Sequence, residues 1–155
     1  MAKPNRASSG QYARGEFKPH GSMQLEQSGF LNVLEATGPF NKELVVAADA
    51  AQESLYASLV QKGRWGTVLI FRESALASLE ALAEISVILM RRKSQGYAPV
   101  AVALVFVPEV EGGTLMQSHY LKAYQNAGID GRIFSNEADA KEWMAGVINR
   151  HPSSS

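Results

Sequence analysis

The chain has 155 residues, of which 46% are hydrophobic, with 15 Lys and Arg balanced by 15 Asp and Glu and no cysteine. A chain of this length can bury a single core, and its formal net charge of +0 supplies no overall field to attract nucleic acid or an anionic membrane. The lack of cysteine excludes disulfides and cysteine-based zinc sites, and no apolar run approaches the roughly 20 residues of a membrane-spanning helix. We therefore expect a cytoplasmic domain with no nucleic-acid partner and no membrane span.

The chain begins with a polar segment. Residues 1–18 are rich in Ser, Gly, Asn, Lys and Arg and show no hydrophobic periodicity, which predicts a disordered tail or leader. Residues 19–150 are expected to form one α/β domain, and residues 151–155 a frayed C-terminus.

Two strands are predicted next, over residues 22–27 and 30–37. They flank Ser28-Gly29, a pair suited to a tight hairpin. The second strand should end at Gly38-Pro39, because proline donates no hydrogen bond to a sheet.

The middle of the chain alternates between helical and strand patterns. Asn41 is a good N-cap for a helix that runs to about Lys62, and residues 67–71 form a continuous apolar run typical of a central strand. A second helix is predicted from Ser74 to about Lys93. Because it is apolar almost all round, we expect it to be well buried. The cations Arg91-Arg92-Lys93 at its end are expected to stay solvated.

The remaining pattern completes an α/β domain. Residues 100–107 are the strongest strand in the sequence, and they are followed by a helix over about 114–127, a strand over 131–134 and a last helix capped by Ser135-Asn136. The order ββαβαβαβα predicts a five-stranded mixed sheet with four helices, parallel except for the first hairpin.

At this point the chain resembles the SpoIIAA-like, or STAS-like, domains, a bacterial family whose members are mostly uncharacterised. The resemblance rests on His20-Gly21, on the junction Thr37-Gly38-Pro39-Phe40-Asn41-Lys42-Glu43, and on Arg132-Ile133-Phe134 followed by Ala140 and Trp143. It implies the same fold and, from the better-known relatives, a regulatory domain that binds protein partners and is switched by serine phosphorylation. Those relatives carry an Asp-Ser-x-Gly type of sequence before the second helix. Here the segment reads Phe71-Arg72-Glu73-Ser74-Ala75-Leu76, which lacks that motif.

Ser74 is the serine of greatest interest. It follows a central strand at an expected helix N-terminus, and ligands of open α/β sheets bind beyond the carboxyl ends of the strands. A helix N-terminus also stabilises an anion, so Ser74 is a candidate phosphorylation site with Arg72 as its partner. The simpler interpretation is that Ser74 only caps the helix.

Glu109 and Glu111 follow the strongest strand, and paired carboxylates can serve acid–base chemistry. The simpler interpretation is a mobile acidic loop, which is a candidate partner contact or lid. His119 is expected to be a surface histidine. A triad of Ser74, His119 and Asp130 can be drawn, but there is no Gly-x-Ser-x-Gly elbow to support it.

No metal or cofactor site is expected. His20, His119 and His151 show no ligand spacing, and there is no glycine-rich phosphate motif. Tyr120 and Tyr124 share a helix face with Met116, which predicts core packing or, where one edge is exposed, an interface.

These patterns favour a non-enzymatic regulatory or binding module that contacts a protein partner through Arg72, Ser74, Glu109, Glu111 and His119. The alternative is a binder of a small molecule or lipid, with its pocket between the second helix and the sheet. An enzyme of unrecognised type is a third hypothesis. A homodimer is compatible with a domain of this size.

Overall fold

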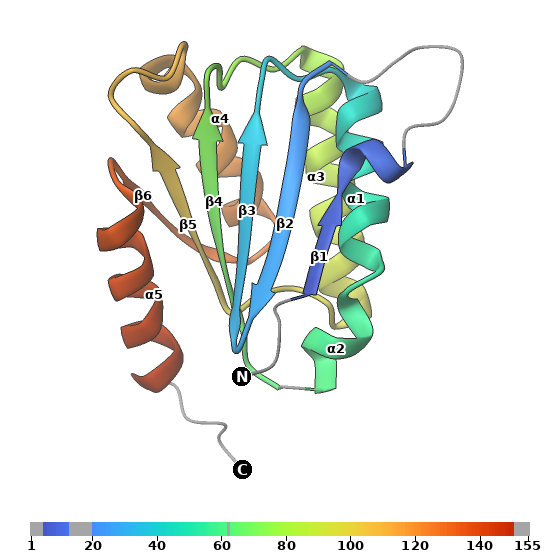
Figure 1. The fold of residues 1–155 in the computed structure, drawn as a ribbon, viewed down its shortest axis with the longest axis vertical. Coiled ribbons are helices and arrows are strands. Elements are labelled where there is room, and N and C mark those ends of the chain that lie inside the picture. The colour runs from blue at the N-terminus through green and yellow to red at the C-terminus, as the bar shows by residue number, and fades with distance from the viewer. Residues whose placement is uncertain (1–4, 13–19, 62, 151–155) are drawn as a thin grey trace.

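The computed structural model describes residues 5–12, 20–61 and 63–150, which form a mixed sheet with helices on both faces (Figure 1). The strands are β1 (Asn5–Ser8), β2 (Ser22–Ser28), β3 (Leu31–Thr37), β4 (Gly66–Arg72), β5 (Ala101–Phe106) and β6 (Asp130–Phe134). The helices are the 3-10 turn η1 (Ser9–Tyr12), α1 (Lys42–Glu53), α2 (Tyr56–Gln61), α3 (Leu79–Gln95), α4 (Gly113–Asn126) and α5 (Glu137–Arg150).

The strands lie in the sheet in the same order as in the chain, β1 to β6. The pairs β1–β2 and β2–β3 are antiparallel, while β3 to β6 are parallel. The predicted α/β class with a mixed sheet is therefore confirmed. The predicted number of five strands is wrong, because the sheet has six.

The sixth strand lies in the segment that was expected to be a disordered tail. β1 pairs with β2, which places Ala7 beside Leu25 and leaves Ala7 only 7% exposed. The Ser9 hydroxyl accepts a hydrogen bond of 2.9 Å from the Met23 amide. The disorder prediction is therefore wrong for residues 5–12. The rest of that tail and the C-terminus predicted to fray lie outside the described residues.

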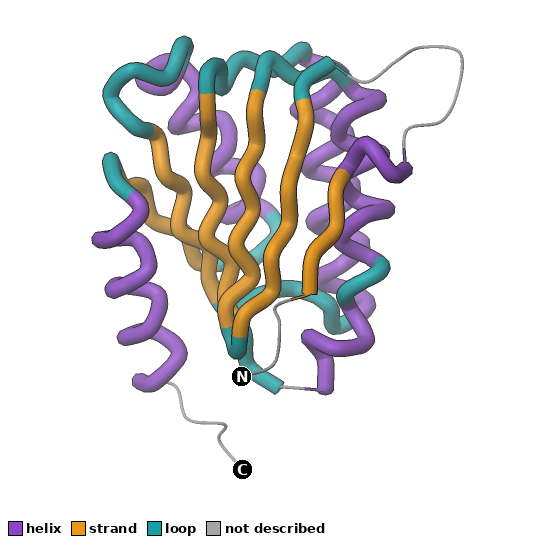
Figure 2. The backbone as a smooth tube through the Cα atoms, viewed as in Figure 1, coloured by secondary structure: helices purple, strands orange, loops and turns teal. Residues whose placement is uncertain are grey.

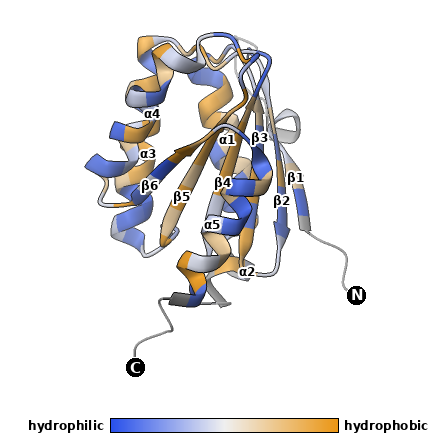
Figure 3. Cartoon of the chain, turned by 90° about the vertical axis from the view of Figure 1, so that its left-hand side faces the viewer, coloured by the Kyte–Doolittle hydropathy of each residue, from blue (hydrophilic) through white to orange (hydrophobic). Residues whose placement is uncertain are grey.

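Side chains of the central strands alternate between two cores. In β4, Leu69 and Phe71 face α1, α3 and α4, whereas Val68 and Ile70 face α5. Figure 3 shows β4 and β5 coloured as hydrophobic along their length, as expected for strands covered on both faces. The sheet is thus the middle layer of three.

The first predicted helix, 41–62, is divided into α1 and α2. Asn41 caps α1 as expected, since its Oδ1 accepts a 3.0 Å hydrogen bond from the Leu44 amide. At the break, the Ser54 hydroxyl donates to the carbonyl of Ala51 at 2.6 Å. This side-chain bond competes with the helical backbone pattern and accompanies the end of α1.

The second predicted helix begins later than expected. Its N-cap is Ser78, whose Oγ accepts a 3.1 Å hydrogen bond from the Ala81 amide, so Ser74 lies in the preceding loop. The expectation that this helix is well buried is also wrong: Leu79, Val87 and Met90 are 85%, 58% and 58% exposed. The reason is geometric, because the sheet, α1 and α4 cover only one side of α3.

The loops at the carboxyl ends of β3 and β4 pack directly against each other (Figure 2). A Cβ at position 38 would overlap the carbonyl oxygen of Ser74, so only glycine allows this approach. The Gly38 amide donates to the Arg72 carbonyl at 3.3 Å, and the Phe40 amide donates to the Leu76 carbonyl at 2.8 Å. These contacts hold the start of α1 and the approach to α3 at fixed positions.

The same strand order determines where a ligand can bind. The crossovers through α1, α3 and α4 all lie on one face, and the order of the six described strands never reverses. The crevice that forms where strand order reverses in doubly wound sheets is therefore absent from this sheet. No helix within the described residues combines the length and apolarity needed to cross a bilayer.

Candidate functional site

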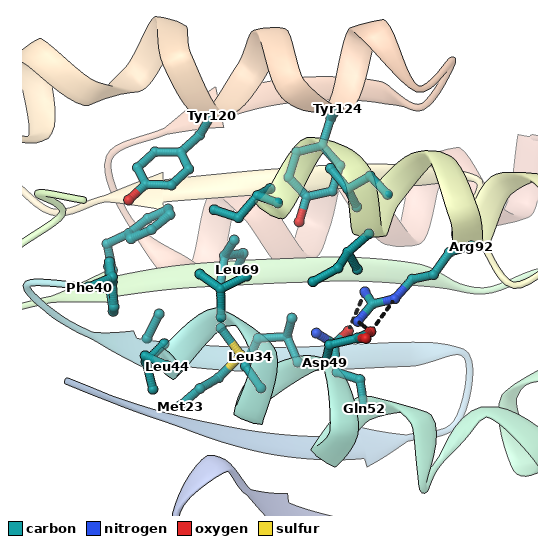
Figure 4. Close-up of a pocket in the computed structure, with 17 residues that line it drawn as sticks. Met23, Leu34, Phe40, Leu44, Asp49, Gln52, Leu69, Arg92, Tyr120 and Tyr124 are labelled. Atoms are coloured by element: carbon teal, nitrogen blue, oxygen red, sulfur yellow. Dashed lines mark hydrogen bonds and ion pairs between the residues drawn. The ribbon is translucent and has the colours of Figure 1, made fainter. Parts of the chain in front are cut away.

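A cavity of about 70 Å³ lies between the sheet and the layer formed by α1, α3 and α4 (Figure 4). Its walls are mostly apolar and come from every element of this layer and from β2, β3 and β4. The side chains that define it are Leu34 and Leu69 from the sheet, Leu44 and Ala48 from α1, and Ile85 and Leu89 from α3.

Small side chains form part of the cavity wall. Ala36 of β3 and Ala48 of α1 both line the cavity and are 1% and 3% exposed. Larger residues such as Leu104 and Phe106 fill the neighbouring parts of the same core. Protein cores are usually packed without voids, so an apolar cavity of this kind is a candidate ligand site.

One end of the cavity is charged. The Arg92 Nε donates to Asp49 at 3.1 Å, and its Nη1 donates to Gln52 at 3.2 Å. Arg91 also pairs with Asp49, and this hydrogen bond, ahead of the charge of Asp49, raises the pKa of Arg91. The Arg92 guanidinium lies 5.2 Å from the centre of the Tyr56 ring. Every interaction at this end links α1 or α2 to α3.

Two tyrosines of α4 form another part of the wall, and their hydroxyls differ. The Tyr120 hydroxyl donates a 2.7 Å hydrogen bond to the carbonyl of Ala75. The Tyr124 hydroxyl points toward the interior of the cavity and makes no hydrogen bond to any described residue (Figure 4). Burial raises the pKa of both groups, opposed at Tyr124 by the charge of Arg92. Tyr124 is therefore a protonated donor at neutral pH, unpartnered within the described part of the chain.

The structure does not gather the residues that were expected to bind a partner. Ser74 is 4% exposed, and its Oγ accepts a 3.2 Å hydrogen bond from the Leu76 amide, so the hydroxyl is not presented to a kinase. The Arg72 side chain lies on the face of the sheet that α5 covers, where it pairs with Glu35 at 3.3 Å and with Glu137 of α5 at 3.5 Å. Arg72 and Ser74 do not form a shared anion site.

The other predicted site residues lie on the surface. Glu109, Glu111 and His119 are all exposed. Their loop is tied down rather than free: the Glu111 amide donates to the Glu73 carbonyl at 2.9 Å, and the Glu111 carbonyl accepts from the Ala75 amide at 2.8 Å.

The serine–histidine–aspartate arrangement is also excluded by topology. Ser74 follows the carboxyl end of β4, whereas Asp130 begins β6, which runs parallel to β4. The two residues therefore lie beyond opposite ends of the parallel strands. Within the described residues, no three side chains of the metal-binding types lie close enough together to hold an ion.

The sequence hypothesis of a pocket between the second helix and the sheet named none of the polar residues that line this cavity. Arg92 was expected to be solvated with its neighbours, yet it is 8% exposed. A signal was present: Arg92 follows the buried Ile88 by four residues, which places both on one helix face. Nothing comparable in the sequence pairs Asp49 with Arg92 across 43 positions.

Comparison of the chain with protein-family models, with curated proteins and with solved structures found no match in any of the three.

Proposed function

We propose that this chain is a non-enzymatic binding module for a small apolar molecule, or the end of one, held in the cavity between α1, α3, α4 and the sheet. The observation that carries the proposal is the apolar pocket, into which the Tyr124 hydroxyl points as a hydrogen-bond donor for a ligand (Figure 4). A ligand oxygen that accepts a hydrogen bond from this hydroxyl contributes about 1 kcal/mol to binding.

The cavity restricts the ligand by size and chemistry. A cavity of about 150 Å³ holds benzene, so this pocket of about 70 Å³, which is partly open to solvent, encloses only part of a ligand of that size, such as the alkyl end of a short-chain ketone. Tyr124 supplies a donor on the wall, which favours a carbonyl or ether oxygen on that chain. The Arg92–Asp49 pair is already satisfied and closes the polar end. The ligand class is therefore a small aliphatic molecule that carries one acceptor oxygen.

Protein binding through the carboxyl-end loops, which the sequence favoured, lacks the clustered residues it requires. Ser74 is buried, and Arg72 is engaged with Glu35 and Glu137. The resemblance to SpoIIAA-like domains and the phosphorylation of Ser74 remain predictions from the sequence. What supports the small-molecule hypothesis is the mostly apolar pocket that the described residues line.

Replacement of Tyr124 by phenylalanine tests the proposal with two readouts, stability and ligand affinity. Without ligand, the variant should be about as stable as the parent, because the change removes no hydrogen bond described within the protein. Its affinity for 2-pentanone, measured by NMR shift titration, should fall about fivefold because one hydrogen bond is lost.

Tyr120→Phe is the matched control, because Tyr120 lines the same cavity but its hydroxyl already donates to Ala75. That variant should lose stability and keep its affinity for 2-pentanone. Equal affinities of the parent and Tyr124→Phe, or shift changes that map outside the cavity, would show that the ligand does not bind at Tyr124.

A further inference from the structure

The solvent-facing side of α3 carries an apolar stripe that no other part of the described chain covers. It consists of Leu79, Ala83, Val87 and Met90, hereafter the α3 stripe, and all of its members are exposed. The opposite side of α3 is buried against the core through Ala81, Ile88 and Leu89. A helix that is apolar on both sides is typical of one buried on both sides, which requires a partner for the stripe.

The charges beside the stripe indicate what that partner is. Glu80, Glu84 and Arg91 follow one another along one flank at intervals of four and seven residues. The acidic pair lies in the N-terminal half of α3 and the cation in the C-terminal half. If a second α3 runs antiparallel across the first, the acidic half of each helix faces the basic half of the other. A twofold pairing of identical chains has this self-complementary form.

The apolar residues fit the same alignment. With the twofold axis between positions 85 and 86, Glu80 of one copy faces Arg91 of the other. In that register, Met90 of each copy lies between Leu79 and Ala83 of its partner, and the two Val87 side chains flank the axis. A single alignment therefore both interdigitates the apolar side chains and pairs the charges. The α3 helix has 17 residues and spans about 25 Å, which is enough for a contact of several turns.

We propose that the α3 stripe is the interface of a homodimer in which two copies of this chain pack α3 against α3 in antiparallel orientation. The proposal rests on different residues from the cavity and does not depend on the ligand. A membrane surface fits the stripe less well, because Glu80 and Glu84 offset Arg91 and Lys93 and leave no net positive charge to attract anionic lipid.

Sedimentation of the full chain from about 10 μM to about 1 mM tests the proposal. The apparent mass should rise with concentration from 16.8 kDa toward twice that value. Val87→Glu places like charges on both sides of the axis and should weaken association at least about tenfold. The control is Leu115→Glu, a similar change at a residue on α4 that is 66% exposed, and it should leave association unchanged.

A charge exchange tests the orientation. Glu80→Lys and Arg91→Glu should each weaken the dimer, because each change alone places like charges opposite each other. The double variant should recover much of the loss, since the exchanged charges again face their opposites across the interface. Because Arg91→Glu also breaks the pair that Arg91 makes with Asp49 of its own chain, thermal unfolding of each variant is measured to check that the fold is retained.

A mass that stays at 16.8 kDa at every concentration would overturn the proposal. So would equal effects of Val87→Glu and Leu115→Glu, or a stripe-dependent binding of neutral lipid vesicles by a chain that remains monomeric.

Discussion

Replacement of Asp49 by alanine should lower the free energy of unfolding by about 3 kcal/mol. Asp49 accepts hydrogen bonds from Arg91 and Arg92, and the Arg92 side chain is only 9% exposed. Without Asp49 the Arg92 guanidinium remains in the core with Gln52 as its one side-chain hydrogen-bond partner among the described residues. An unpaired buried charge of this kind is among the most destabilising changes in a protein. Urea unfolding at neutral pH measures the effect.

The matched control for Asp49 is Glu137, which also pairs with two cations. Glu137 contacts Arg72 at 3.5 Å and Lys141 at 2.6 Å. Its side chain is 37% exposed, and the side chains of both partners are 41% exposed. Surface pairs contribute little, so Glu137→Ala should cost less than about 1 kcal/mol. If Asp49→Ala costs no more than Glu137→Ala, Asp49 does not hold Arg92 in the core.

The fold should lose stability steeply at alkaline pH. Burial raises the pKa values of Tyr56, Tyr120 and Tyr124 above the ordinary value of 10.0. Between that value and the higher native pKa, the unfolded chain releases a proton that the native chain keeps, so rising pH favours unfolding. Below pH 10 the contribution is fully present. Above it, each tyrosine lowers the free energy of unfolding by about 1.4 kcal/mol per pH unit.

Single Tyr→Phe variants isolate this effect from the titration of lysines. Urea unfolding of the parent and of Tyr124→Phe, compared from about pH 9 to about pH 11.5, should show a slope shallower in the variant by about 1.4 kcal/mol per pH unit. Identical slopes in the parent and in all three variants would mean that these hydroxyls are open to solvent in the native state.

The parallel part of the sheet could be predicted because its signal is local. Residues 67–71 and 100–107 are continuous apolar runs, and only strands covered on both faces need that pattern. β1 could not be predicted in this way. It has four residues, of which Ala7 is the one with a hydrophobic side chain buried against β2, so the segment carries no periodicity to detect.

The burial of α3 was overestimated for a related reason. The apolar pattern of α3 predicts that both of its sides are buried. The sequence does not indicate whether the surface that buries the outer side belongs to the same chain or to another one. The cavity was predicted only in its general place. Its volume depends on the fit of side chains such as Ala36, Ala48 and Tyr124, which are far apart in the chain and meet only in the folded core.

The central claim, that the cavity binds a small apolar ligand, is tested most directly by filling it. Ala48→Val adds methyl groups to the cavity wall, while Ala50→Val makes the same change on α1 at a half-buried position outside the cavity. The measurement is the affinity of each variant for 2-pentanone, by NMR shift titration. We expect Ala48→Val to lose at least about tenfold in affinity while its thermal stability is equal or higher, and Ala50→Val to bind like the parent. Undiminished binding by a stably folded Ala48→Val would show that the ligand does not occupy this cavity.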